Sequence, residues 1–411
     1  MTVPTIQAFI NFSTGAIFAG DMVLDTGKLD TNVIAGPTLI VDVSDQVDSI
    51  ITNRGRNAQA DQFQTGTMSL RLIDQSGYFN PQNPNSPYAG LISPMRKVEI
   101  KANYNGVNYD IFSGFITSYT SSIPLTAYDI VTTTIQAIDG FRLAQNAQIA
   151  TVAATPAGQL SGARINAILD DIAWPVSQRD IDTGLTTLQA DPGTARTALA
   201  AMQTVETSEF GALYCGKNGY FVFQDRSVTA GSIGGTPVVF SDDGSGISYF
   251  NAIWRLDDTL VYNEANITAT GLAVQTASNQ ASIDKYFLHS YNQQNLLMQT
   301  TSAALDYARS YVASREATSI RCDAIELNLY TNDYNTGIVA GLDLDFFDPV
   351  TVTTTQAGGT VLTKTLQVFG ISHNVTPGSW RTTLTTLEPI LDAFILDSTL
   401  YGVLDDSVLS Y

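Results

Sequence analysis

Apolar and polar residues alternate with period two along many short segments of this chain. Five of them, at residues 38–44, 66–74, 97–104, 109–119 and 130–139, carry β-branched or aromatic residues at every second position between turn residues. Such segments predict strands that bury one face and leave the other in water. We therefore expect a β-barrel or sandwich over residues 36–150.

The pattern changes to helical spacing in residues 151–235. The stretch SGARINAILDDIAWP predicts a helix with Ser161 as its N-cap, and DPGTARTALAAMQTVET predicts a second one with Pro192 in its first turn. A hairpin should follow, because Asn218-Gly219 lies between two aromatic runs and favours a type I′ turn. These elements predict a small α/β insert domain.

A second β-rich region is expected at residues 236–390. It contains one long helix, NLLMQTTSAALDYARSYVASREA, whose apolar stripe comprises Leu297, Leu305, Ala308 and Val312. Residues 1–35 and 391–411 lack a long periodic element and are expected to form N- and C-terminal arms. The whole chain is thus predicted to be mainly β with a smaller α/β part, of the α+β class.

Two segments share the same order of features. Residues 94–119 and 349–375 each begin with Pro, continue into a V-x-[IV] strand and a Gly-containing turn, and end in a longer strand with Gly and an aliphatic residue. A Thr-rich strand follows each segment. Two Thr-rich β regions could match in this way by chance. If the repeat is real, the chain holds two copies of one β-barrel on either side of the insert.

Charge and composition exclude several classes of protein. The 411 residues include 20 Lys and Arg against 39 Asp and Glu, a net charge of −19, so the chain as a whole should repel nucleic acid. The two cysteines, Cys215 and Cys322, lack the spacing of a disulfide framework or a metal site. The sequence contains no run of 18 apolar residues and no basic leader, so we expect assembly in a cytoplasm and no membrane span.

The sequence offers no constellation for catalysis. GALYCGKN at 211–218 fits most of a P-loop but ends in Asn218 and precedes a strand, and His289 and His373 are isolated. Asp343 and Asp345 in LDLDF are predicted to lie on the same face of a strand, as an acidic and half-solvated surface. The sequence leaves open whether the acidic loops bind calcium. We expect no enzyme, no cofactor and no resident metal.

Residues 54–100 carry a spaced series of motifs: an RGR start, an aromatic and Gly before a strand, a D-x-x-G-x-[FY]-[ND]-P loop, and a "spY…l.P" segment that enters a basic strand. The residues are Arg54-Gly55-Arg56, Phe63, Gly66, Asp74, Gly77, Phe79, Asn80-Pro81, Ser86-Pro87-Tyr88, Pro94 and Arg96-Lys97. This series resembles the minor tail proteins of long-tailed bacteriophages. Similar patterns continue at the 296–315 helix, at Trp380 and at the C-terminus, so the likeness spans most of the chain.

The resemblance implies a tail-tip hub, similar to baseplate hubs and tail-associated proteins. Such hubs are homotrimers with two tube-like β-barrels in each chain, which form a ring of six that joins a hexameric tail tube to a trimeric tip. The implied partners are a distal tail protein or tail tube, a tape measure protein and receptor-binding proteins, and phage DNA would pass through without specific binding. The acidic balance suggests a negative channel wall, with Asp343 and Asp345 as candidate channel-facing residues.

The loop LIDQSGYFNPQNPNSPY carries the candidate contacts between subunits, Tyr78, Phe79 and Tyr88. These aromatics are expected to pack either on their own barrel or on the next subunit of a ring. Two other functions stay open: a hexameric distal-tail or carbohydrate-binding tip component that contacts the host surface, and a soluble glycan-processing enzyme.

Overall fold

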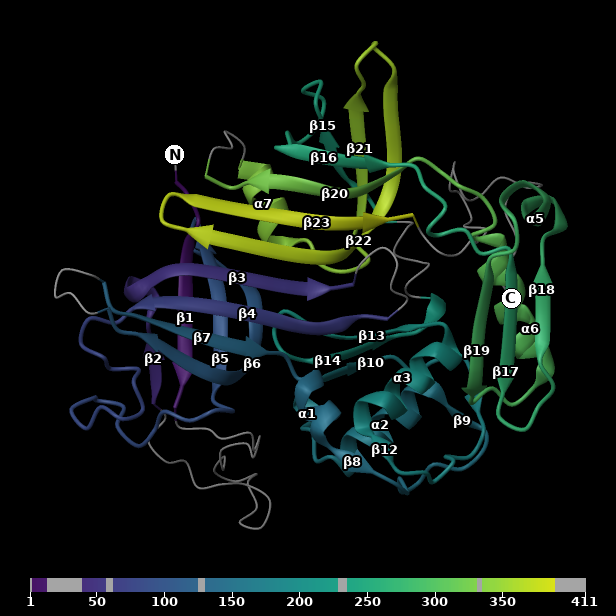
Figure 1. Ribbon diagram of the computed structural model, residues 1–411, viewed down its shortest axis with the longest axis horizontal. Helices are drawn as coiled ribbons and strands as arrows, with labels where there is room; N and C mark the ends of the chain where they lie inside the picture. Colours follow the sequence, from purple (N-terminus) through teal and green to yellow (C-terminus); the bar gives the residue numbers. More distant parts are fainter. Residues whose placement is uncertain are drawn as a thin grey trace.

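The computed structural model describes residues 2–12, 39–56, 62–124, 130–227, 235–330 and 335–388. One continuous sheet of thirteen strands dominates the described part (Figure 1). Its main path runs β16-β20-β23-β22-β3-β4-β7-β6-β5-β1-β2, and β21 and β15 branch from β22. The strands are β1 Thr5–Asn11, β2 Ile40–Asp42, β3 Val47–Gly55, β4 Gln64–Ile73, β5 Lys97–Tyr104, β6 Val107–Ser122, β7 Thr132–Ile138, β15 Val238–Ser241, β16 Asn251–Arg255, β20 Arg321–Asn328, β21 Pro349–Thr355, β22 Val361–Thr376 and β23 Ser379–Leu387.

The sheet has two directions of strands. In Figure 1, β20, β23, β22, β3 and β4 run across the view one below another, while β1, β2 and β5 run down it. The long strands β6 and β22 bend and take part in both directions: the first half of β6 pairs with β5 and its second half with β7. In the same way, the first half of β22 pairs with β21 and its second half with β23.

Alternation in the sequence explains the core of this sheet. In β4 every second residue is buried, from Met68 to Leu72, and the residues between them face water. A single apolar cluster joins the strands of both directions, including Ile50 of β3, Val98 of β5 and Leu384 of β23. The five strands predicted between residues 38 and 139 are confirmed. The prediction of two separate barrels is not, because the sheet is continuous.

Residues 141–227 form a compact insert with its own apolar core. A three-stranded sheet, β10-β14-β13, packs with helices α1 Phe141–Asn146, α2 Ser161–Asp171 and α3 Ala198–Glu209. The insert's strands are β8 Gln148–Ile149, β9 Gln159–Leu160, β10 Arg179–Ile181, β11 Thr187–Leu188, β12 Arg196–Thr197, β13 Ala212–Cys215 and β14 Phe221–Gln224. The insert also contains the short 3₁₀ helix η2 Val176–Gln178, and another, η1 Ser44–Gln46, lies between β2 and β3.

Details of the predicted insert are wrong at the ends of its elements. Leu160 precedes α2, and the Ser161 hydroxyl donates to the Glu209 carboxylate at 2.8 Å instead of capping the helix. Thr197 caps α3, so Pro192 lies outside the helix. The predicted hairpin is confirmed, but only Gly219 of the Asn218-Gly219 pair has a positive φ, which a type I′ turn requires at both residues.

A second insert occupies residues 256–320, which the sequence placed within the second β region. Its sheet β18-β17-β19 packs against the predicted long helix, α6. The elements are β17 Glu264–Ala269, β18 Gln275–Ser278, α5 Gln280–Tyr286, β19 Ser290–Leu296 and α6 Thr301–Ala313. The buried stripe of α6 includes Tyr307, Ala308, Tyr311 and Val312, whereas Leu297 precedes the helix.

Three expectations about the ends of the chain have different outcomes. Residues 5–11, expected in an arm, form β1 inside the sheet, where they pair with β5 along their whole length. The predicted arm residues 13–35 and 391–411 lie outside the described residues. No helix in the described ranges is long and apolar enough to cross a bilayer.

Candidate functional site: an assembly surface

The sheet contains the same arrangement of strands twice. The first unit consists of β3, β4, β7 and the second half of β6, and the second unit consists of β16, β20, β23 and the second half of β22. In both units neighbouring strands are antiparallel in the same order. The last strand of each unit also has a bulge at the same place, after Ile116 in β6 and after Val368 in β22. The strand order of the internal repeat predicted from the sequence is therefore confirmed, but the two glycines that suggested it are not equivalent, because Gly370 corresponds to Ser118 and not to Gly114.

Side chains support the equivalence at single positions. Counting from the two bulges, Ser121 of β6 corresponds to His373 of β22, and Thr133 of β7 corresponds to Thr382 of β23. Ser121 and Thr133 share a hydrogen bond of 3.1 Å between hydroxyls, and the His373 ring bonds the Thr382 hydroxyl at 3.0 Å. Each unit thus has a side-chain hydrogen bond between its last two strands at the equivalent position. Burial lowers the pKa of His373 to about 3, so this histidine is neutral and structural.

The two units are joined edge to edge by β3 and β22. Residues Ile50 to Gly55 of β3 pair antiparallel with Gly370 to Val375 of β22. Gly55 has φ +108°, and a Cβ there would lie 2.3 Å from the Phe369 carbonyl oxygen, so only glycine fits this close approach. The strand pairing turns the two four-stranded units into one surface of eight strands.

Charged groups fix the back of this junction. Arg54 lies on the core side of β3 and pairs with Asp345 at 3.2 Å, while Lys217 of the first insert lies 3.8 Å from the same carboxylate. The Arg54 guanidinium also lies over the Phe346 ring at 4.8 Å. Because the Arg54 side chain is only 6% exposed, these contacts hold a charge that would otherwise be costly to bury.

Asp343 and Asp345 are not on a strand, so that prediction is wrong. Asp343 is the last residue of helix α7 Asn335–Asp343, and Asp345 follows in the loop before β21. Leu342 and Leu344 are buried, as predicted, but they belong to a helix and the loop after it, which pack in the main apolar cluster. Asp345 belongs to the junction on the core side of the eight strands.

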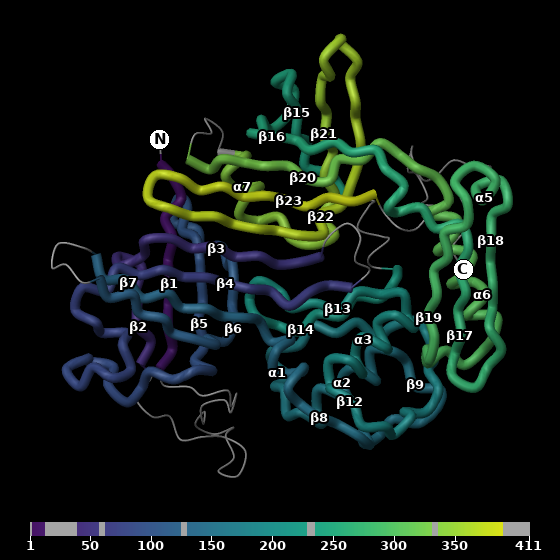
Figure 2. The backbone as a smooth tube through the Cα atoms, in the orientation of Figure 1, coloured from purple at the N-terminus to yellow at the C-terminus, as the bar shows by residue number. Residues whose placement is uncertain are grey.

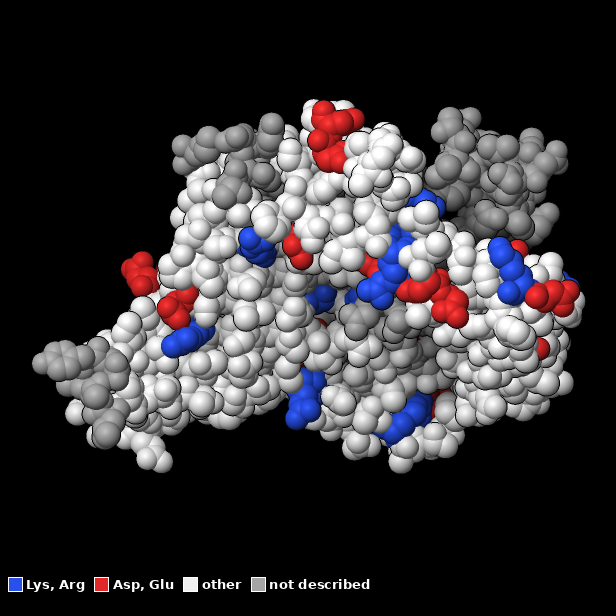
Figure 3. Space-filling model, turned by 45° about the horizontal axis from the view of Figure 1, so that its top comes forward, with Lys and Arg blue, Asp and Glu red and all other residues white. Residues whose placement is uncertain are grey.

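The opposite face of the eight strands carries few charges. Register places on it the residues that alternate with the core, and most have hydroxyl or amide side chains. They include Ser49, Ile51, Asn53, Thr67, Ser69, Arg71, Ile73, Ser118, Thr120, Ser122, Thr132, Thr134, Gln136, Asn251, Ile253, Glu326, Asn328, Ser372, Asn374, Arg381, Thr383 and Thr385. Figure 3 shows this side of the molecule, where uncharged residues cover most of the surface above the strands. We call this surface the polar face.

The candidate loop residues have separate environments. Phe79 is fully buried and its ring lies 5.5 Å from that of Tyr88, which in turn stacks on Phe12 at 5.0 Å. Asp74 holds the loop by accepting the backbone N–H groups of Tyr78 and Phe79 at 2.7 and 3.1 Å. Phe79 therefore packs on its own chain and is unsuited to a contact with a neighbour. Tyr78 is 38% exposed and stays a candidate contact.

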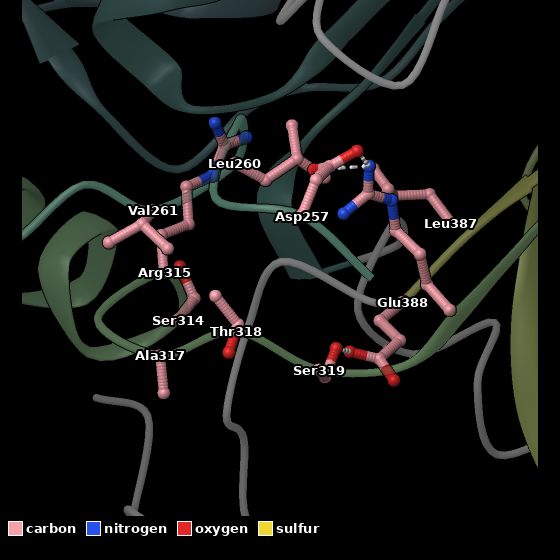
Figure 4. Close-up of a pocket in the computed structure, with 11 residues that line it drawn as sticks. Asp257, Leu260, Val261, Ser314, Arg315, Ala317, Thr318, Ser319, Leu387 and Glu388 are labelled. Atoms are coloured by element: carbon pink, nitrogen blue, oxygen red, sulfur yellow. Dashed lines mark hydrogen bonds and ion pairs between the residues drawn. The ribbon is translucent and has the colours of Figure 1, made fainter. Parts of the chain in front are cut away.

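A small pocket lies where the second insert joins β20 and β23 (Figure 4). Arg321 binds the Asp257 carboxylate at 2.8 and 2.9 Å, and Ser319 donates to Glu388 at 2.7 Å. Hydrogen bonds from the Thr259 hydroxyl and from Arg321 lower the pKa of Asp257 to about 2. These groups bind one another, so the pocket anchors the insert and presents no reactive side chain.

We looked for metal ligands and reactive cysteines among the described residues. Among them, no group of three His, Cys, Asp or Glu side chains is placed to hold a metal ion. Both cysteines are buried and free, and burial raises the pKa of the Cys322 thiol to about 11.

Known proteins were compared by sequence and by structure. No family model and no curated protein matches the sequence. Among solved structures, a tail protein from Neisseria meningitidis MC58 aligns with a TM-score of 0.57 at 10% identity, over 94% of this chain and 97% of that one. The 43 kDa tail protein of prophage MuSo2 from Shewanella oneidensis aligns with a TM-score of 0.54 at 14% identity, over 87% and 98%.

The chain has a phage tail protein fold. The alignments run over nearly the full length of both relatives, so the shared tail protein fold covers the two units and is not confined to one of them. The resemblance carried by residues 54–100 is thereby confirmed at the level of fold. The sequence did not reveal that the two units join through β3 and β22, because it does not show which distant strands become neighbours.

Proposed function

We propose that this chain is a structural protein of a bacteriophage tail, and that it forms a hub-like ring between tail tube and tail tip. The observation that carries the proposal is the duplication: one chain supplies two equivalent four-stranded units of one sheet. A ring of three chains then has six equivalent units and can match sixfold and threefold neighbours at once. The tail protein fold of the solved relatives supports the same reading.

The polar face is the proposed wall of the DNA channel. Eight strands from each of three chains make 24 strands around the channel (8 × 3), with the polar face inward and the inserts outside. Hydroxyl and amide groups dominate this face, and its charges include both Arg71, paired with Asp48 at 3.4 Å, and Glu326. This replaces the expected acidic wall at Asp343 and Asp345. The cations of the polar face are few, with Arg71 paired with Asp48 and Arg381 stacked on the Phe250 ring, so the wall offers phosphates few binding partners and DNA slides past it.

Ring order tests the proposal. Cryo-EM of purified rings or of whole particles, with no symmetry imposed, should show three chains and six units around a channel. Six chains in the ring would favour the alternative, a hexameric distal-tail or carbohydrate-binding tip component. A protein that stays monomeric at every concentration and is absent from particles would refute the proposal.

The channel wall has its own test. Thr134 of the first unit and Thr383 of the second occupy equivalent positions on the polar face, so replacing both by Lys adds six cations to a trimeric channel (2 × 3). We expect the variant ring to retain DNA in a salt-dependent manner and the wild-type ring to release it. Thr363→Lys, on the first half of β22 outside the eight strands, is the matched control. Equal retention by all three proteins would contradict the channel assignment.

A further inference from the structure

The two ends of the eight-stranded surface are unpaired in the single chain. The outer edge of β16 has no strand partner among the described residues, because β16 pairs only with β20. The second half of β6, beyond Ile116, pairs with β7 on one side and with no described strand on the other. Figure 2 shows these two strands at opposite ends of the stack. Open edges of this kind are templates for pairing with another chain.

Because of the duplication, the two free edges are equivalent to the two strands that pair inside the chain, β3 and β22. β16 occupies in the second unit the place of β3 in the first, since β3 pairs with β4 as β16 pairs with β20. The second half of β6 occupies in the first unit the place of the second half of β22 in the second. Inside the chain β3 and β22 pair, so each free edge is the counterpart of one member of an existing pair.

From this we infer that β16 of one subunit pairs antiparallel with the second half of β6 of the next subunit, in the register of the internal β3–β22 junction. The inference rests on the proposed ring and names its contact. Counted through the bulges, Ile253 of β16 corresponds to Ile51 of β3, and Ser122 of β6 corresponds to Asn374 of β22. Ile51 lies opposite Asn374, so Ile253 lies opposite Ser122 of the neighbour.

Exposure of the equivalent residues agrees with a missing strand. Val375 at the end of the junction is 4% exposed because it lies opposite Ile50. Its counterpart in the first unit, Ile123, is an aliphatic residue of the same kind and is 68% exposed in the single chain. On the other free edge, Ile253 is 39% exposed and Phe250 is 58% exposed. The β6 edge thus leaves open an aliphatic residue whose counterpart is buried at the internal junction, whereas Ile253 is about as exposed as its counterpart Ile51, which is 44% exposed on the polar face.

A second copy of this chain is the occupant that fits both edges. One edge belongs to β16 and the other to β6, so the contact runs head to tail and repeats from subunit to subunit until the ring closes. The polar face then continues without interruption across the subunit boundary, as it does across the β3–β22 junction. The pairing does not depend on the number of chains in the ring.

Cysteine pairs test the register. Ile253→Cys with Ser122→Cys in one chain should give covalent oligomers between subunits on treatment with a short thiol crosslinker. Ile51→Cys with Asn374→Cys is the positive control, because these residues lie opposite each other within the chain and should crosslink without forming oligomers. Ile253→Cys with Val107→Cys, at the far end of β6, is the negative control. The native cysteines are buried and should not contribute.

A second variant tests the edge without a crosslinker. Ile123→Asp places a carboxylate where only the assembled ring would bury it, so the chain should fold and the concentration for half-assembly should rise at least about 100-fold. Val107→Asp, at a residue that is 51% exposed at the start of β6, is the matched control and should leave assembly unchanged.

The outcomes separate the inference from the proposed function. Rings of normal size whose 122–253 pair does not crosslink, while the 51–374 pair does, would overturn the inference and leave the ring standing. Absence of any oligomer for the wild-type chain, by analytical ultracentrifugation and in particles, would overturn the proposed function itself.

Discussion

Replacing Phe79 by Ala asks whether the aromatic loop stabilises its own chain or a neighbour. The side chain is fully buried, packs against Tyr88, and belongs to the apolar cluster shared by both units. Truncating a buried Phe removes its transfer free energy and leaves a cavity, so we expect a loss of about 3–5 kcal/mol in the free energy of unfolding. Tyr78→Ala, at a half-buried neighbour in the same loop, should cost less than about 1 kcal/mol.

Hydrogen exchange measured by mass spectrometry is the suitable assay. Peptides that cover residues 64–104 report on β4, the loop and β5, and a loss of about 3 kcal/mol lowers their protection by more than a hundredfold. Protection in the first insert, which has its own core, serves as the internal reference. A Phe79→Ala protein with unchanged protection but no assembly would refute this reasoning and show that the loop is an interface.

The remaining predictions concern the junction and one buried acid. Gly55→Ala should prevent normal folding or lower the free energy of unfolding by more than about 2 kcal/mol, because the new Cβ would meet main-chain atoms. Gly106 also has a positive φ but has open space around it, so Gly106→Ala should lower the free energy of unfolding by about 1 kcal/mol. Urea unfolding of the two variants measures both values. Asp345→Asn should destabilise the chain by about 1–3 kcal/mol through the loss of its ion pairs, measured in the same way. Burial raises the pKa of Asp139 from 3.8 to about 7. Between pH 4 and 7 the folded chain therefore keeps a proton on this carboxyl group that the unfolded chain has lost. The contribution of Asp139 to the free energy of unfolding accordingly falls as the pH rises from about 4 to 7. Asp139→Asn should remove that fall, and an unchanged difference between wild type and variant from pH 4 to 7 would contradict it.

Much of the strand content follows from alternation alone. β4, β5 and β7 bury alternate residues and are bounded by turn residues, so their sequences predict them within a few positions. β3 is harder to find, because Ile51 faces the polar face beside the buried Ile50 and breaks the alternation. The strands of the second insert were missed for a similar reason: β19 reads SYNQQNL, which is mostly polar.

Helix α7 shows where a pattern can mislead. Leu342, Asp343 and Leu344 alternate like a half-buried strand, yet the preceding residues continue a helix, and burial of Ile338 and Leu342 follows the helical repeat. The duplication is visible in the sequence only as an order of features, since the two copies share hardly any residues. The assembly surface depends on which edges remain open, and that follows only from the pairing of strands far apart in the chain.

The β3–β22 junction also has a consequence for synthesis. β3 is complete when residue 55 leaves the ribosome, but its partner is not available until residues 361–376 have been made. Contacts of such large sequence separation form late and slowly. Until then the exposed edge of β3 can accept the β22 of another nascent chain, which reproduces the native pairing in a swapped form. Translation rate and chaperone supply should therefore govern the yield of correctly closed chains.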